Sequence, residues 1–198
     1  LLDVGVACLA NQSMNYLHSG VVPQRMGNAH PNTVPYQDFP TADGHMILAV
    51  GNDGQFARFC KTAGRPEWAD DARFVTNAGR VQNRVALIEL MRALTVTRST
   101  REWVALLESA GVPCGPINTL ADVFEDPQVQ ARGMQIHMDH AARDDVALVA
   151  SPIRMSDTPV QYRHAPPLLG QHTREVLGDM LALDEETMTT LFEKGVLA

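Results

Sequence analysis

One segment of the sequence combines residue types that could bind an anionic ligand. Residues 25–32 are polar, contain Gly27 and His30, and lead directly into a predicted strand. A loop of this kind can present backbone N–H groups and an imidazole to an anion. The same residues are also ordinary turn formers, so a surface connector is the alternative interpretation. The sequence alone leaves both interpretations open.

A second segment, residues 50–55, places a glycine turn between a predicted strand and the start of a predicted helix. A helix N-terminus in that position can bind an anion. Neither G-x-G-x-x-G nor G-x-x-x-x-G-K is present, however, and Asp53 already supplies negative charge at the helix start. These features favour a structural helix start over a phosphate site.

Two further groups carry ligand or nucleophile chemistry in principle. His137 and His140 have aspartates nearby, but in a strand and turn their rings point to opposite faces, so we expect no metal site. Cys114 would need a histidine and an activating environment to act as a nucleophile, and a small buried thiol is the favoured interpretation. Because G-x-S-x-G, H-E-x-x-H and paired-carboxylate signatures are all missing, the sequence contains no evident complete set of catalytic residues.

The composition narrows the class of protein. The 198 residues are 45% hydrophobic, as in a globular protein, and their formal net charge of −7 disfavours binding to duplex nucleic acid. No apolar run approaches the roughly 20 residues that span a bilayer, so no membrane partner is expected. The three cysteines, Cys8, Cys60 and Cys114, are widely spaced, which favours reduced thiols in a cytoplasmic protein.

The elements that would position these residues are mixed α and β, with helices in excess. An Asp-Gly pair at Asp43 predicts a hairpin turn, and Ser99-x-x-Glu102 is a capping box. We predict a helix over residues 1–19, a loop over 20–35, strands at 34–39 and 45–50, a helix from residue 52 or 53 to Gly64, helices at 79–95 and from Ser99 to Gly111, and an extended segment at 112–118.

The second part of the chain is predicted to be less regular. We expect short helical turns at 119–125 and 127–132, strands at 134–138 and 147–151 with a polar turn near 143–145, a Pro-rich extended segment at 152–171, and helices at 172–182 and 185–193. Asp184 is placed to cap the last helix. The chain starts at Leu1 with no cap or turn before the first predicted helix, which indicates a piece of a longer protein; a trimmed complete domain is the alternative.

Several motifs in this order resemble the class III (family III) CoA-transferases, the carnitine- and formyl-CoA-transferase group. The matching segments are residues 25–36, which include Arg-Met-Gly-Asn-x-His-Pro-Asn, 111–118, which read Gly-Val-Pro-Cys-Gly-Pro-Ile-Asn, 126–134, and 151–154 with 166–173. Residues 1–3 resemble the start of the helix that follows the core strand of that family. Each motif is weak alone, but four in register over essentially the whole chain are specific.

The resemblance implies a fold. Members of the family have a large Rossmann-like N-terminal domain and a smaller C-terminal α/β domain, and two chains interlock as a homodimer. This sequence is similar to the C-terminal half, with the large domain mostly absent. The implied divisions are residues 1–24, a helix and connector belonging with the large domain; 25–151, the small α/β domain; and 152–198, a crossing segment and helices that return to the large domain.

The resemblance also implies a mechanism. An aspartate carboxylate attacks the acyl-CoA thioester, the released CoA thiolate converts the resulting anhydride into an aspartyl-CoA thioester, and an acceptor carboxylate completes the exchange. The substrates are then acyl-CoA and a carboxylic acid, with the coenzyme A thioester as substrate and no permanently bound cofactor. The nucleophilic aspartate belongs to the N-terminal half, so no residue here inherits that role and the isolated chain is expected to be inactive.

What carries over to this sequence is a substrate loop. The glycine-rich loop of formyl-CoA-transferase-like members matches the substrate-binding candidates Gly27, Asn28, His30, Pro31 and Asn32. Because His30, Pro31 and Asn32 replace glycines, the loop is stiffer, which favours a larger acyl or dicarboxylate substrate over formyl or oxalate.

Two alternatives to a transferase stay open. One is an enzyme like the α-methylacyl-CoA racemases, which share the fold but abstract a proton; their usual Gly-Ala-Pro differs from the Asn28-x-His30-Pro31 pattern here. The other is a truncated dimerisation module without catalytic function. The sequence does not identify the acyl donor or acceptor.

Overall fold

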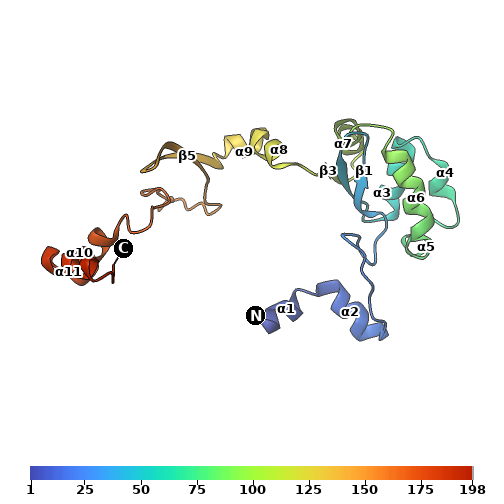
Figure 1. The fold of residues 1–198 in the computed structure, drawn as a ribbon. Coiled ribbons are helices and arrows are strands. Elements are labelled where there is room, and N and C mark those ends of the chain that lie inside the picture. Colours follow the sequence, from blue (N-terminus) through green and yellow to red (C-terminus); the bar gives the residue numbers. More distant parts are fainter. Residues whose placement is uncertain (198) are drawn as a thin grey trace. The chain divides into compact units, whose positions relative to one another are not determined.

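The computed structural model describes residues 1–197 and divides the chain into two compact units, Leu1–Ile117 and Asn118–Ala198 (Figure 1). The architecture is mixed α and β and rich in helix, as the sequence predicted. Among residues 1–197, no helix combines the length and the apolar character that a membrane crossing requires. The predicted domain limits at residues 24 and 151 concern packing in a complete enzyme and stay predictions.

The first unit is built on a three-stranded antiparallel sheet with β2 in the middle. Its strands are β1 (Tyr36–Pro40), β2 (His45–Ala49) and β3 (Cys114–Pro116), in the order β1-β2-β3. Its helices are α1 (Leu2–Ala7), α2 (Ala10–Ser19), α3 (Asp53–Thr62), α4 (Glu67–Asp70), α5 (Asn77–Gln82), α6 (Arg84–Thr95) and α7 (Thr100–Ser109). The predicted hairpin is confirmed, with Phe39 opposite Met46.

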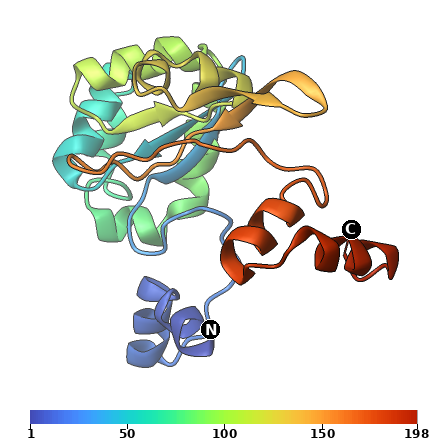
Figure 2. The same ribbon diagram turned by 90° about the vertical axis from the view of Figure 1, so that its left-hand side faces the viewer.

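Helices α3, α6 and α7 enclose the core of this unit with the sheet (Figure 2). Alternate residues of each hairpin strand are buried, as the two-residue period of a strand requires. The apolar faces of the helices supply the rest, and the indole Nε1 of Trp103 donates to the Thr95 carbonyl at 2.7 Å, so this buried polar group is satisfied. The fully buried apolar side chains are Phe39, Met46, Leu48, Val50, Phe59, Cys60, Phe74, Leu87, Met91, Trp103 and Leu107.

Helix starts in this unit follow the predicted capping chemistry. The Asn52 side chain accepts from the backbone N–H of Gln55 at 2.9 Å, and Ser99 forms a reciprocal capping box with Glu102. Gly64 then has a φ of 74°, a left-handed conformation that favours glycine after a helix. The predicted starts and the Gly64 stop are therefore confirmed.

The sequence predicted two continuous helices in the first unit that the structure shows to be interrupted, and these predictions are wrong in that respect. The helix over 1–19 is interrupted at Cys8 and Leu9, and Ala10 has a φ of 43°. The helix over 79–95 is two helices that meet at Asn83. The Asn83 amide donates to the Gly79 carbonyl at 2.9 Å and to the Arg73 carbonyl at 3.3 Å, and such side-chain bonds compete with the helical ladder.

The second unit contains a two-stranded sheet and four helices in its described residues. The elements are α8 (Leu120–Glu125), α9 (Pro127–Ala131), β4 (Gln135–His140), β5 (Arg143–Val149), α10 (Thr173–Leu181) and α11 (Glu185–Glu193). An extended segment over 152–171 joins the sheet to the last two helices, as predicted. Asp184 caps α11 by accepting from the Thr187 N–H at 2.8 Å.

The predicted polar turn near residues 143–145 is wrong. These residues belong to β5, and the chain reverses at residues 141–142, between the paired residues His140 and Arg143. The ring Nδ1 of His140 accepts from the Ala142 N–H at 3.1 Å. A histidine therefore performs the turn-forming bond that Asn or Asp side chains usually make, and no standard turn residue marks the site.

Candidate functional site

The predicted substrate-binding residues form a loop between α2 and β1, which we call the 27–32 loop. Gly27 has a φ of 63° with open space where a Cβ would lie, and Asn28 is exposed while accepting from the Asp38 N–H at 3.4 Å. His30 and Pro31 are half-buried. The loop thus lies at the surface of the first unit with its polar groups accessible.

His30 is held by bonds from both its backbone and its ring. Its backbone N–H donates to the Tyr36 carbonyl at 2.9 Å, and its ring lies tilted against the Tyr36 ring with centroids 5.3 Å apart. Ring Nδ1 accepts from the Asn32 N–H at 3.1 Å. Ring Nε2 lies 3.2 Å from the Asn11 amide nitrogen, and the roles of the two ring nitrogens depend on the tautomer.

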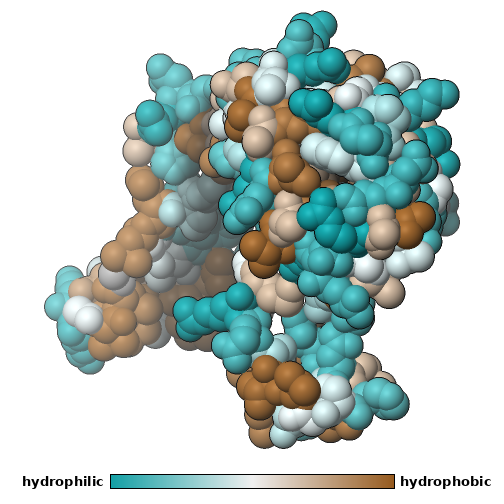
Figure 3. Space-filling view, turned by 90° about the vertical axis from the view of Figure 1, so that its right-hand side faces the viewer, coloured by the Kyte–Doolittle hydropathy of each residue, from teal (hydrophilic) through white to brown (hydrophobic). Residues whose placement is uncertain are grey.

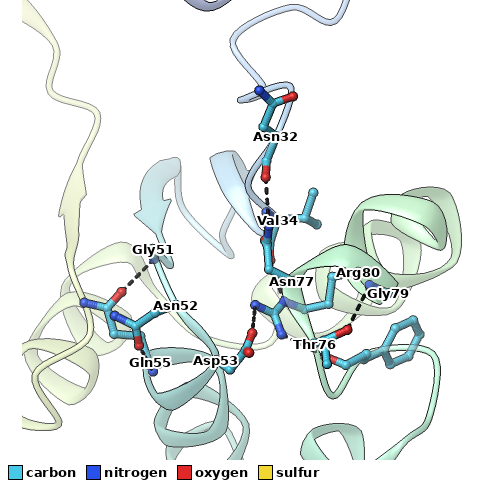
Figure 4. A network of polar contacts seen from close by, with 11 residues as sticks. Asn32, Val34, Gly51, Asn52, Asp53, Gln55, Thr76, Asn77, Gly79 and Arg80 are labelled. Atoms are coloured by element: carbon cyan, nitrogen blue, oxygen red, sulfur yellow. Dashed lines mark hydrogen bonds and ion pairs between the residues drawn. The ribbon is translucent and has the colours of Figure 1, made fainter. Parts of the chain in front are cut away.

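Asn32 connects the loop to helices on both of its sides. Its side chain exchanges two hydrogen bonds with Asn15 of α2, at 3.0 and 3.2 Å. On the other side, the Asn77 amide donates to the Asn32 carbonyl at 2.8 Å, and the Asn77 Oδ1 accepts from the Val34 N–H at 3.2 Å (Figure 4). The loop is consequently tied to α2 and to the start of α5.

Two arginines complete the support of this segment, and sequence reasoning missed both. Arg84 Nη2 donates to the carbonyls of His30 at 2.9 Å and Pro31 at 2.7 Å. Burial lowers the pKa of Arg84 below its ordinary value. Arg80 is fully buried, and its Nε donates to the Val34 carbonyl at 2.6 Å. The carbonyls of His30, Pro31 and Val34 therefore accept hydrogen bonds from arginines of α5 and α6.

The spacing of these arginines in the sequence indicates that both lie on a buried helix face. In the continuous helix that the sequence predicted, Arg80 and Arg84 fall on the same face as Leu87 and Met91, which are buried. An arginine on a buried helix face must find acceptors, since an unpaired buried charge is costly. That argument would have indicated carbonyl or carboxylate partners, although not which ones.

The segment at residues 50–55 is a structural helix start, as favoured above. Asn52 caps the Gln55 N–H, and Gln55 Oε1 in return accepts from the Gly51 N–H at 2.6 Å (Figure 4). Asp53 forms an ion pair with Arg80 at 2.8 Å, and the guanidinium also lies over the Phe56 ring. The N–H groups of Gly51 and Gln55 are thus bonded within the protein, and the Asp53 carboxylate pairs with the buried Arg80.

The remaining candidates are separate from the loop. In the second unit, His137 Nδ1 lies 2.6 Å from Asp145 Oδ2, whereas the His140 ring serves its own turn. Burial raises the pKa of the Cys114 thiol, which donates to the Val104 carbonyl at 3.8 Å. Within residues 1–197, no cluster of three or more His, Cys, Asp or Glu could hold a metal ion.

The 27–32 loop has groups that can bind and orient a ligand but lacks a carboxylate that could form an anhydride. Its sequence, Gly-Asn-Ala-His-Pro-Asn, contains no hydroxyl, thiol or carboxylate. The backbone N–H groups of His30 and Asn32 and the Arg84 guanidinium are already bonded within the unit, so the loop presents the Asn28 amide and the His30 ring to an anionic ligand. Whether these residues bind substrate stays a prediction.

Comparison with known proteins gives a family and a set of relatives. The model of the family described as CoA-transferase family III matches residues 1–173. The chain is 46% identical over 184 residues, 93% of its length, to "Succinate--glutarate CoA-transferase" of Agrobacterium fabrum, and 40% identical over its whole length to "Succinyl-CoA:glutarate CoA-transferase" of Mus musculus. It covers 46% and 45% of those proteins, so it spans about half their length.

A solved structure also matches this chain over about half of its own length. The crystal structure of a CAIB/BAIF family protein from Brucella suis is 46% identical in sequence and superposes with a TM-score of 0.74. The match covers 87% of this chain and 44% of that one.

Proposed function

This chain belongs to CoA-transferase family III, and from that premise we propose that the complete protein moves CoA from an acyl-CoA donor to a carboxylic acid acceptor. The observation that carries the proposal is the 46% identity to a succinate–glutarate CoA-transferase over 93% of this chain. The relatives reported above are named for CoA transfer, which favours this reaction over racemisation and over a module without activity.

The proposed substrates are a dicarboxylyl-CoA donor and a dicarboxylate acceptor of four or five carbons. The names of the relatives, which pair succinate or succinyl-CoA with glutarate, support this choice. The 27–32 loop supports it as well, because His30 and Asn32 are each tied by hydrogen bonds where glycines would be free. A stiff polar loop that carries the His30 imidazole suits an acid with a second carboxylate.

The chemistry that we propose runs through an aspartate supplied by the part of the protein that precedes this chain. Its carboxylate displaces CoA thiolate from the donor to form a mixed anhydride, and the thiolate then attacks the aspartyl carbonyl, which gives an aspartyl-CoA thioester and releases the donor acid. The acceptor carboxylate displaces CoA thiolate from this thioester to form a second anhydride, and attack of the thiolate on the acceptor acyl group yields the new acyl-CoA and restores the aspartate. In this scheme Gly27, Asn28, His30, Pro31 and Asn32 cover the intermediate, exclude water and orient the incoming carboxylate. A homodimer, a cytoplasmic location and the absence of a resident cofactor belong to the same proposal.

The test is the activity of the complete protein. Purified full-length enzyme is incubated with succinyl-CoA and glutarate, and formation of glutaryl-CoA is followed by chromatography. Acetate as acceptor is the control for the second carboxylate, and the 198-residue chain alone is the control for the missing nucleophile. Transfer to glutarate by the full-length protein, with none by the isolated chain, is the expected result. No transfer to any carboxylate would refute the proposed function.

A further inference from the structure

We propose that Arg84 is a positioning residue that fixes the backbone of the 27–32 loop and thereby sets where the His30 ring stands. The proposal rests on the proposed function, because it assigns the loop a part in CoA transfer. Arg84 itself makes no contact in this scheme with the reacting atoms. It acts through the two carbonyls that its guanidinium holds.

A single nitrogen of Arg84 makes both hydrogen bonds to the loop. Nη2 of Arg84 donates to the carbonyls of both His30 and Pro31, at 2.9 and 2.7 Å. The N–H of the same histidine is bonded to the Tyr36 carbonyl. With its N–H and its C=O both fixed, the backbone of His30 has little freedom and limits the rotamers of the ring, which its bond to the Asn32 N–H then orients.

Further hydrogen bonds hold the backbone of residues 32–34, which follow His30 and Pro31. The side chain of Asn77, in α5, donates to the Asn32 carbonyl and accepts from the Val34 N–H (Figure 4). Arg80, also in α5, donates to the Val34 carbonyl. Arg84, at the start of α6, bonds to the preceding residues His30 and Pro31. These contacts join residues 43 to 54 positions apart, so they define the loop through tertiary structure.

The charge of Arg84 also argues for a role beyond packing. The residue is half-buried, and among the described residues no carboxylate lies within ion-pair distance of it. Partial burial of a cation paired only with carbonyls costs free energy, whereas an apolar side chain could fill the same space without that cost. Retaining the cation here makes sense if the loop must be held accurately beside an anionic ligand.

The experiment compares three substitutions in the full-length enzyme. Arg84→Met removes both hydrogen bonds while keeping the length and apolar volume of the side chain. Arg84→Lys keeps one cationic donor, which can reach two adjacent carbonyls because a single nitrogen bridges them in the structure. Arg92→Met, at an exposed position further along α6, is the matched control.

Kinetics give the first readout. We expect Arg84→Met to lower kcat about tenfold per folded active site, with KM for donor and acceptor within about twofold of wild type. Arg84→Lys should recover most of the loss, and Arg92→Met should match wild type. Wild-type kcat in Arg84→Met would overturn the proposal. So would a loss confined to KM for a dicarboxylate acceptor, because that outcome indicates direct contact with the substrate.

Hydrogen exchange gives a second readout that does not depend on activity. In Arg84→Met, the amides of His30 and Asn32 should exchange about tenfold faster, while those of β1 and β2 keep their protection. Loss of protection throughout the sheet would mean a purely structural role and would overturn the proposal. If Arg84→Lys restores loop protection without restoring kcat, positioning is not what the reaction needs.

The two proposals fail in different ways. A full-length wild-type protein that transfers no CoA refutes the proposed function, and the exchange measurement then still decides whether Arg84 fixes the loop. Equal exchange in wild type and Arg84→Met overturns the inference about Arg84 even if the enzyme is active.

Discussion

The central part of the first unit and the two helices that precede it differ in what happens to their apolar side chains. Residues 34–112 supply a core in which Phe39, Trp103 and Leu107 are completely buried. Helices α1 and α2 instead leave their apolar residues in solvent, and Figure 3 shows this hydrophobic surface at the bottom of the view. The exposed residues of this part are Leu1, Leu2, Val4, Val6, Leu9, Met14, Tyr16 and Leu17.

The difference teaches which part of the chain holds itself together. Isolated helices shorter than about 12 residues are marginal in water unless an apolar face is packed, and α2 has 10 residues. The core region satisfies that requirement internally, whereas α1 and α2 do not. The 27–32 loop lies between the two regions. Half-buried side chains of α5 and α6 and side-chain amides of α2 both bond to its second half, residues 30–32.

Thiol reactivity should show the largest contrast between the regions. Burial raises the pKa of Cys60 from 9.0 to about 12, while Cys8 is exposed at the end of α1. Because the thiolate is the nucleophile, we expect iodoacetamide to modify Cys60 at least about a thousandfold more slowly than Cys8 at pH 8. Mass spectrometry of peptides after timed quenching measures both rates. In guanidinium chloride the two should react alike, and equal rates without denaturant would contradict a closed core.

A matched pair of leucines sharpens the comparison in free energy. Leu107 of α7 is completely buried and Leu17 of α2 is 74% exposed, yet Leu→Ala removes the same atoms from both. We expect Leu107→Ala to lower the free energy of unfolding by about 3 kcal/mol and Leu17→Ala by less than about 0.5 kcal/mol.

Urea titration of the 198-residue chain, followed by tryptophan fluorescence, measures this difference, because both tryptophans, Trp68 and Trp103, lie in the first unit. A cost for Leu17→Ala as large as that for Leu107→Ala would mean that α2 packs its apolar face in solution. The comparison between the regions would then be wrong.

The same contrast explains what the sequence could predict. Caps at Asn52, Ser99 and Asp184 depend on residues three positions away, so local patterns located them. The hairpin followed from alternation and an Asp-Gly turn. Elements with local causes were therefore predicted to within a few residues.

Elements with tertiary causes were not predicted. The break at Asn83 depends on a carbonyl ten positions away, and the turn at residues 141–142 uses a histidine in place of a standard turn residue. The polar residues of the 27–32 loop could be singled out from their types. Their supports, Arg80 and Arg84, lie about 50 positions further along the chain, and only the folded structure brings them together.

Substitution of His30 tests whether the 27–32 loop takes part in the reaction. We expect His30→Ala in the full-length enzyme to lower kcat/KM for the acceptor about tenfold to a hundredfold, roughly 1.4–2.7 kcal/mol, the scale of one lost charge-assisted contact. Formation of the enzyme–CoA thioester should suffer less than its discharge, and single-turnover measurements separate the two steps.

The matched control for this test is His30→Asn. An Asn side chain can accept from the N–H two residues on, as ring Nδ1 of His30 does from Asn32, but it lacks the imidazole Nε2. If His30→Asn restores wild-type kcat/KM, the residue only shapes the turn before Pro31, and the functional interpretation is wrong. A loss equal to that of His30→Ala supports a role for the ring in the reaction.

The smallest expected effect is a pH dependence inside the core region. The Asp43 carboxylate accepts from the backbone N–H of Thr100 at 2.7 Å and from the hydroxyls of Thr100 and Thr41. Its bond to the Thr100 backbone, with smaller contributions from the two hydroxyls, lowers its pKa below the ordinary value of 3.8. A lowered folded pKa stabilises the protein above 3.8 and loses that contribution as pH falls through the folded value.

Asp43→Asn should therefore lower the urea midpoint at pH 7, and the gap from wild type should shrink as pH falls below 3.8. Urea titrations followed by tryptophan fluorescence between pH 7 and about pH 3 measure the gap. Asp3→Asn on α1, outside the buried core, is the matched control substitution. A gap for Asp43→Asn that stays constant with pH would mean that the amide, not the charge, explains the loss. The hairpin turn would then be joined to α7 by hydrogen-bond geometry alone, without help from the ionised carboxylate.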